Sequence, residues 1–332
     1  MGSLAGCNGG SGTTTTEAGG NGTPEPEPVE IKTLGAEGAI YIPVYFLAQE
    51  EGIWERNGID LSLEVAGFGK YTRAFTADLS DLTSFPTISG GQNIVNGEDV
   101  AFVGSHMNLN NPTFVRADSD ISSVSDIEGK RLGVPFETST NTLTNKAMWS
   151  NILDFDMFED PAETVSAAPP TLWNLLVNDE EIDAMITFTG YAIRGRASDE
   201  VKTIFDPVEV WQDETGFPPA VTNIVADRQW AMNNPQTVLN FKSAWKEAVQ
   251  FFRENIDRGI TQYGALAGLS SEDEIQVVKD QVAETRVFPD TWSEDYIGSV
   301  WTLFEYLNNT GDLSSVPDQD EYSFTDDELE GM

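Results

Sequence analysis

Apolar and polar positions from residue 30 onward alternate between a strand-like pattern and a pattern typical of amphipathic helices. Short apolar runs predict strands at Ile31–Leu34, Ile59–Val65, Asp81–Phe85, Asp99–Val103, Arg131–Val134, Ile182–Phe188 and Pro219–Ala226. Helical spacing predicts helices over Pro43–Glu55, Tyr71–Leu79, Pro86–Val95, Thr140–Leu153, Leu172–Val177 and Pro235–Asn255. Alternating strands and helices favour an α/β architecture with mainly parallel strands.

The charge of the chain narrows the possible partners. Lys and Arg number 18 and Asp and Glu 55, which gives a formal net charge of −37. Such a surface repels nucleic acid and anionic lipid, so we expect no nucleic-acid partner. With 39% hydrophobic residues, 18 Phe and 8 Trp, the chain can nevertheless build a sizeable core. The composition resembles that of halophilic proteins, whose self-repulsion is screened by concentrated salt, and we expect the fold to loosen at low salt.

The one cysteine, Cys7, follows Leu4-Ala5-Gly6. This sequence resembles a lipobox, which implies export and a lipid anchor on the extracellular face of the cell membrane; a chance run of small residues is the alternative. Only six residues precede Cys7, none of them basic, so we expect the signal peptide to be truncated. Residues 8–28 are rich in Gly, Thr and Pro and predict a flexible tether, and no apolar run of about 18 residues predicts a membrane span.

Few residues suit metal or redox chemistry. One cysteine excludes an internal disulfide and any cysteine cluster for metal, and His106 is the only histidine. We therefore expect no metal and no cofactor.

Several sequence segments, taken in order, resemble those of one known family. They are Tyr41–Ala48 followed by Glu51–Asp60, Ser125–Pro135, Glu181–Ala184 with Glu180 in place of the usual glycine, and Asn233–Pro235 with the helix after it. Their order and spacing over residues 30–255 are similar to type II solute-binding proteins of ABC importers, in the group that binds nitrate, sulfonates, taurine and thiamine-pyrimidine precursors. The part from Arg258 onward matches only loosely.

The resemblance implies a two-lobed type II periplasmic-binding-protein fold. Each lobe would be a mainly parallel sheet flanked by helices, with a ligand cleft between the lobes. The expected organisation is a lipobox and tether over residues 1–28, a first lobe over 29–122, a second lobe over 123–218, a return to the first lobe with C-terminal helices over 219–320, and an acidic tail over 321–332. We also expect the chain from Asp312 onward to be frayed.

The resemblance places ligand contacts on loops that follow strands, where crevices form in α/β folds. Ser139, Thr140 and Asn141 stand before a helix, so their hydroxyl and N–H groups would hold an anionic group, although a cap alone is the alternative. Tyr41 and Phe68 correspond to cleft aromatics, with core packing as the alternative. The other candidates follow strands and are Ser84, Phe85, His106, Thr189, Tyr191 and Arg194. A structural hydrogen-bonding role is the alternative for His106, and a surface position is the alternative for Tyr191.

Charge would decide the ligand class. Lys70 with Arg73, or Arg194 with Arg196, would clamp a sulfonate or carboxylate if either pair faced the cleft, whereas both pairs would otherwise be solvated. A cleft rich in aromatic residues would instead favour a flat heterocycle.

We therefore expect a monomeric binding protein, not an enzyme, that captures a sulfonate-like or taurine-like, nitrate-like or pyrimidine-like ligand by hinge closure and delivers it to an ABC permease. An enzyme on the same fold is an alternative, but pyrimidine synthases carry a cysteine-rich motif absent here, and menaquinone-pathway enzymes are cytosolic. A ligand-sensing module is a third possibility.

Overall fold

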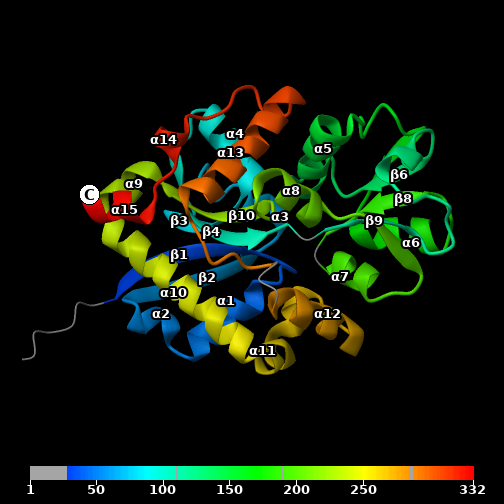
Figure 1. Cartoon of the computed structure of the whole chain (residues 1–332). Coiled ribbons are helices and arrows are strands. Elements are labelled where there is room, and N and C mark those ends of the chain that lie inside the picture. Colours follow the sequence, from blue (N-terminus) through cyan, green and yellow to red (C-terminus); the bar gives the residue numbers. More distant parts are fainter. Residues whose placement is uncertain (1–27, 110, 189, 284–286) are drawn as a thin grey trace, which may run out of the picture.

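The computed structural model describes residues 28–109, 111–188, 190–283 and 287–332. The predicted lipobox cysteine Cys7, nearly all of the predicted tether and the predicted ligand contact Thr189 lie outside these residues. The described chain forms two lobes, each with its own β-structure flanked by helices (Figure 1). In the part of the chain that is described, no helix is both long enough and apolar enough to cross a membrane.

The first lobe contains two neighbouring groups of strands. β1 (Val29–Ala36) and β2 (Ile59–Ala66) pair in parallel. β3 (Leu82–Pro86), β10 (Ala220–Asp227) and β4 (Val100–Asn108) form a sheet in that order, with β10 antiparallel to both neighbours. Side chains connect the two groups, because the Thr33 hydroxyl donates to the Thr83 hydroxyl at 2.9 Å and Thr83 donates to the carbonyl of Leu34 at 3.0 Å.

The second lobe contains a five-stranded sheet in the order β7-β6-β8-β5-β9. Its strands are β5 (Thr113–Arg116), β6 (Arg131–Val134), β7 (Glu163–Ser166), β8 (Ala184–Ile186) and β9 (Val201–Phe205). β6 pairs in parallel with β7 and β8, whereas β5 is antiparallel to β8 and β9. Four strands therefore run in one direction and β5 alone in the other.

β5 and β10 run antiparallel to their neighbours in the sheets. β5 is the first strand after the chain crosses into the second lobe, and β10 is the first strand after it returns to the first lobe. β5 follows β4 after residues 109–112, and β10 follows β9 after α8 (Pro207–Thr215). The expected two-lobed fold is confirmed, and these two strands are the exceptions to its parallel order. The lobe boundary expected at residues 122 and 123 stays a prediction, but the pairing of β5 shows that the chain joins the second sheet at Thr113.

Helices cover both faces of the first lobe (Figure 1). On one face lie α1 (Ile42–Glu50), α2 (Ile53–Arg56), α10 (Pro235–Glu254) and α11 (Ile256–Tyr263); α4 (Thr87–Val95) and α13 (Glu294–Asn309) lie on the other. The remaining helices are α3 (Phe68–Tyr71), α5 (Thr140–Leu153), α6 (Pro169–Val177), α7 (Gly190–Arg196), α9 (Arg228–Asn233), α12 (Glu272–Ala283), α14 (Gln319–Tyr322) and α15 (Asp326–Gly331).

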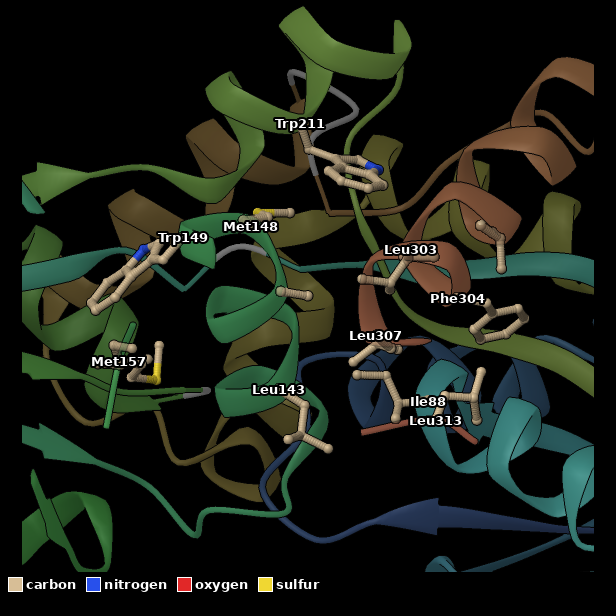
Figure 2. Close-up of a cluster of buried hydrophobic side chains, with 14 of the residues drawn as sticks. Ile88, Leu143, Met148, Trp149, Met157, Trp211, Leu303, Phe304, Leu307 and Leu313 are labelled. Carbon is tan, nitrogen blue, oxygen red and sulfur yellow. The ribbon is translucent and has the colours of Figure 1, made fainter. Parts of the chain in front are cut away.

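One buried cluster joins the lobes on the side of α4, α5 and α13, and we call it the seam. Leu143 of α5, Ile88 of α4, and Leu307 of α13 all belong to this cluster, as does Leu313 just beyond α13 (Figure 2). Because α5 connects β6 to β7, this helix belongs to the second lobe while packing against α13 and α4. The seam is therefore one of the regions in which the lobes pack together, and α7 against α12 is another.

Two of the helix predictions are wrong. The helix expected over Pro43–Glu55 is split into α1 and α2, because Gly52 has a φ of 65°. The helix expected over Tyr71–Leu79 is absent: α3 ends at Tyr71 and turns follow, although Ala74 and Phe75 are buried.

The chain from Asp312 onward is not frayed. Leu313, Phe324 and Leu329 are buried, because the segment packs against the first lobe, where the Phe324 N–H donates to the carbonyl of Phe102 at 2.9 Å. The expectation of fraying rested on the acidic composition of the segment, which still leaves enough apolar residues for packing.

Candidate ligand-binding site

A cavity of about 130 Å³ lies between the two lobes. The first lobe lines it with residues that follow β1, with α3, and with parts of β3, β4 and β10. The second lobe contributes the segment after β6, the start of α5 and Phe188 after β8. A smaller hollow of about 80 Å³ shares Met107, Asn141 and Val221 with this cavity, so both belong to one cleft.

Aromatic side chains dominate the wall of the larger cavity. They are Tyr41, Phe68 and Tyr71 from the first lobe and Phe136 and Phe188 from the second. Phe68 and Phe136 are 50% and 47% exposed, and the ring centroids of Phe136 and Phe188 lie 6.4 Å apart. Exposed aromatic surface facing a cavity from both lobes is a suitable contact for an apolar or flat ligand.

The start of α5 supplies polar groups to the same cavity. The Ser139 hydroxyl accepts from the Thr142 N–H at 3.2 Å and donates to the carbonyl of Pro135 at 2.8 Å, so it serves as the helix cap. The Thr140 hydroxyl makes no hydrogen bond to other described residues, and the Asn141 side chain accepts from the Asn111 amide. Because the first N–H groups of a helix lack partners within it, this end of α5 offers donors to the cavity.

Tyr41 and Tyr71 combine an apolar ring with a buried hydroxyl. The Tyr41 hydroxyl accepts from the Ala36 N–H at 2.7 Å, and that of Tyr71 lies 3.4 Å from the Ser84 hydroxyl. Burial raises the pKa of both tyrosines above the ordinary value, so both phenols stay protonated near neutral pH. Both side chains therefore contribute uncharged surface to the cavity wall.

Three predicted contacts lie behind the wall instead of on it. Ser84, Phe85 and His106 are fully buried and line neither hollow. Phe85 packs against Phe75 with ring centroids 5.0 Å apart and belongs to the core. His106 is held between Tyr45 and Thr222, and burial lowers its pKa to about 3, so its imidazole is neutral at physiological pH.

The basic candidates have partners away from both hollows. Arg194 is exposed and stacks over Trp173 at 4.6 Å, and Tyr191 lies against the same indole with centroids 6.1 Å apart. Arg196 pairs with Asp206 at 3.1 Å, and Lys70 pairs with Glu64 at 2.5 Å.

Among the described residues that line the two hollows, none is Lys or Arg, and Glu37 is the only carboxylate. The neutral polar lining comes from Asn108, Asn111, Asn141, Gln281, Ser139, Thr140 and Thr222. No group of three or more residues suited to hold a metal ion occurs within the described ranges.

Sequence reasoning missed several wall residues, among them Phe136, Phe188 and Thr222. Phe188 directly precedes Thr189, a predicted contact, and Phe136 follows Pro135 at the end of the predicted strand. Both residues therefore lie directly after strands, where the sequence predicts ligand contacts. Thr222 carried no such signal, because it lies inside β10, where it pairs with Pro86 and Met107, two further residues of the cavity wall.

Comparison with known proteins agrees with this architecture. The family model described as NMT1/THI5-like matches residues 40–258. A search of curated protein sequences gave no match.

Solved structures share the fold at low sequence identity. The periplasmic aliphatic sulphonate-binding protein SsuA from Escherichia coli is 16% identical with a TM-score of 0.71, covering 90% of this chain and 92% of that one. The alkanesulfonate-binding protein SsuA from Xanthomonas axonopodis pv. citri, bound to MOPS, is 14% identical with a TM-score of 0.67, covering 91% and 100%. A mutant of DSZB in complex with biphenyl-2-sulfinic acid is 15% identical with a TM-score of 0.67, covering 91% and 98%. DSZB is a desulfurization enzyme, so the fold serves both binding and catalysis.

Proposed function

Because the chain belongs to the NMT1/THI5-like family, we propose that it is the extracellular solute-binding component of an ABC import system. The observation that carries the proposal is the cavity between the lobes, walled by aromatic side chains from both and by the start of α5. A ligand in this cavity contacts both lobes at once and so stabilises the closed arrangement. Closure then presents the loaded protein to a membrane permease.

The cavity wall favours an organic ligand over a small inorganic anion such as nitrate. Five aromatic rings offer apolar contact that nitrate cannot use, and in the described wall no cation balances a negative charge. An anionic head, such as a sulfonate, would depend on the hydrogen-bond donors at the start of α5. A neutral flat ring, such as a pyrimidine, would depend mainly on stacking and on the amide side chains.

An enzyme is the second candidate, because DSZB has the same fold. The described wall of the cavity supplies hydroxyls, amides and one exposed carboxylate, Glu37, but no cysteine, histidine or lysine. This set suits recognition better than nucleophilic or acid–base catalysis. We therefore favour binding without chemical turnover.

The lipid anchor remains part of the proposal and rests on Cys7 and the tract after it. A protein tethered on the extracellular face would stay close to its permease. Mass spectrometry of the protein from native membranes tests this point. An unmodified Cys7 would contradict the lipid anchor but would leave the argument for ligand binding in the cavity unchanged.

A thermal-shift panel in molar KCl tests the binding function. The compounds are MOPS, taurine, alkanesulfonates of increasing chain length, a methylpyrimidine and nitrate. A ligand that binds only the folded state raises the melting temperature, and saturation at about 100 times Kd contributes about 2.7 kcal/mol. We expect a shift with at least one ring or alkyl compound and none with nitrate. No shift with any compound would contradict the proposed function.

A further inference from the structure

The pairing of β4 with β10 is irregular beside the cavity. Asn108 pairs with Ala220, Met107 with Thr222, and Ser105 with Asn223. Two residues are therefore left without an opposite partner, Val221 on β10 and His106 on β4. Such bulges change the direction of side chains and occur near functional sites.

The irregularity explains why two successive residues of β10 line the cavity. Successive residues of a regular strand face opposite sides of the sheet, yet Val221 and Thr222 both line the cavity. His106, the extra residue on β4, is fully buried directly behind Thr222. Its ring stacks on Trp245 at 4.2 Å and meets the edge of Tyr41 at 4.7 Å, so the imidazole is held in one orientation.

Two hydrogen bonds connect His106 to hydroxyl groups. Nδ1 lies 2.8 Å from Oγ1 of Thr222, and Nε2 lies 3.4 Å from the hydroxyl of Tyr45. A neutral imidazole has one N–H and one bare nitrogen, so it donates to one hydroxyl and accepts from the other. Which nitrogen carries the hydrogen decides whether Thr222 acts as acceptor or donor toward His106.

The surroundings of Tyr45 decide between the two arrangements. The Tyr45 hydroxyl is fully buried, and its proton needs an acceptor. Among the described residues, Nε2 of His106 is the one hydrogen-bond partner within reach of this hydroxyl, at 3.4 Å. The Tyr45 proton is satisfied only if Nε2 is bare and accepts it, which places the imidazole hydrogen on Nδ1.

We infer that His106 donates its Nδ1–H to Thr222 and thereby leaves the Thr222 hydroxyl hydrogen free to donate to a ligand in the cavity. This inference rests on the proposed binding function and adds a requirement for the ligand, which must place an acceptor atom against Thr222. A sulfonate or carboxylate oxygen, a carbonyl oxygen or a bare ring nitrogen meets this requirement. His106 itself does not touch the ligand and is a positioning residue.

The single histidine makes the tautomer directly measurable. In protein labelled with ¹⁵N-histidine, NMR reports one imidazole, and the two nitrogens differ strongly in shift when only one is protonated. We expect a protonated Nδ1 and a bare Nε2 in the folded protein in molar KCl, without any ligand. Tyr45→Phe removes the donor to Nε2 and should weaken this preference, whereas Tyr263→Phe, at a surface tyrosine that donates to Glu50, should leave it unchanged. A protonated Nε2 in the wild-type protein would overturn the inference.

Ligand binding supplies the second measurement, with MOPS as the probe. Thr222→Val removes the hydroxyl at nearly constant shape, and we expect about tenfold weaker binding, since a hydrogen bond to a charged group is lost. Thr222→Ser should bind within about threefold of wild type, on the same scale. Thr302→Val is the matched control, because the Thr302 hydroxyl donates within its own helix to the carbonyl of Gly298. Unchanged MOPS binding by Thr222→Val would overturn the inference. If the wild-type protein bound no compound of the panel, the proposed function would fail, while the tautomer would still decide the hydrogen-bond direction.

Discussion

Lys146 and Asp312 form an ion pair across the seam between the lobes, with Nζ of Lys146 2.7 Å from Oδ2 of Asp312. The two side chains are only 19% and 17% exposed. Lys146 lies on α5, the helix that begins at the cavity with Ser139 and Thr140, and Asp312 follows α13. One helix therefore connects the cavity wall to the seam.

Asp312→Asn should reduce the free energy of unfolding by about 1–3 kcal/mol, because it leaves a largely buried ammonium without its counter-charge. Urea unfolding in molar KCl measures this change. The control is Glu64→Gln, whose partner Lys70 is 42% exposed in a pair that we expect to contribute less than about 1 kcal/mol. If both substitutions lowered the free energy of unfolding equally, the ion pair at the seam would contribute no more than an exposed ion pair.

Phe68→Ala and Phe136→Ala should each weaken binding of the best ring-containing compound of the panel by about 1–2 kcal/mol, or roughly 5–30-fold, because each removes aromatic contact from one side of the cavity. Isothermal titration calorimetry measures the affinity. Leu153→Ala, at the opposite end of α5 and 40% exposed, is the control and should leave the affinity unchanged. Unaltered affinity in both phenylalanine variants would mean that the ligand binds elsewhere.

Much of the fold could be predicted from the sequence, because it depends on local periodicity. The helix predicted at Thr140–Leu153 is observed with the same bounds, and the helix from Pro235 ends one residue before the predicted Asn255. Three strands, β5, β7 and β9, have no counterpart among the predicted strands. The four residues of β5 pair between β8 and β9, and partners so distant in sequence leave no local pattern.

The cavity was predictable only where its residues follow regular strands. Tyr41, Phe68 and Ser139 to Asn141 line it, in agreement with the expected positions, although their contact with a ligand stays a prediction. Thr222 does not follow a strand but lies within β10, and His106, which the sequence places on the wall, is the extra residue of a bulge in β4 and is buried behind Thr222. Such bulges depend on the pairing of distant segments and not on local sequence.

Glu180→Gly should stabilise the folded protein by up to about 1 kcal/mol. Glu180 stands where the resembling motif has glycine, and its φ of 53° lies in the left-handed region that side chains disfavour. The gain is limited because glycine also makes the unfolded chain more flexible. Thermal unfolding compares this variant with Glu181→Gly, whose φ is not positive and which should not stabilise. A lower melting temperature for Glu180→Gly would show that its side chain, 3.9 Å from Arg116, matters more than backbone strain.

The melting temperature should rise markedly between low salt and molar KCl. A net charge of −37 makes the compact state repel itself, and the Debye length falls from about 30 Å at 0.01 M to about 3 Å at 1 M. Differential scanning calorimetry over a KCl series measures the effect, and a series at constant ionic strength with a larger cation separates screening from specific K⁺ binding. A melting temperature independent of salt would contradict the halophilic interpretation.

The titration of His106 should lower the stability of the fold as the pH falls from neutral. In the unfolded chain this imidazole titrates near 6.5, whereas burial among Tyr41, Tyr45 and Trp245 lowers its pKa to about 3 in the folded protein. Between these two values the unfolded state binds a proton that the folded state does not, so protonation favours unfolding. The full contribution is present above 6.5, and we expect a loss of about 2 kcal/mol between about pH 7 and about pH 5.

His106→Gln isolates this contribution, because glutamine keeps hydrogen-bonding groups but does not titrate. Both proteins have the same carboxylates, so the difference between their pH profiles reports the histidine. Urea unfolding in molar KCl at several pH values gives the profiles. If the two profiles were parallel, the imidazole would have to be accessible to protons in the folded state, and it could not then hold Thr222 in a fixed direction.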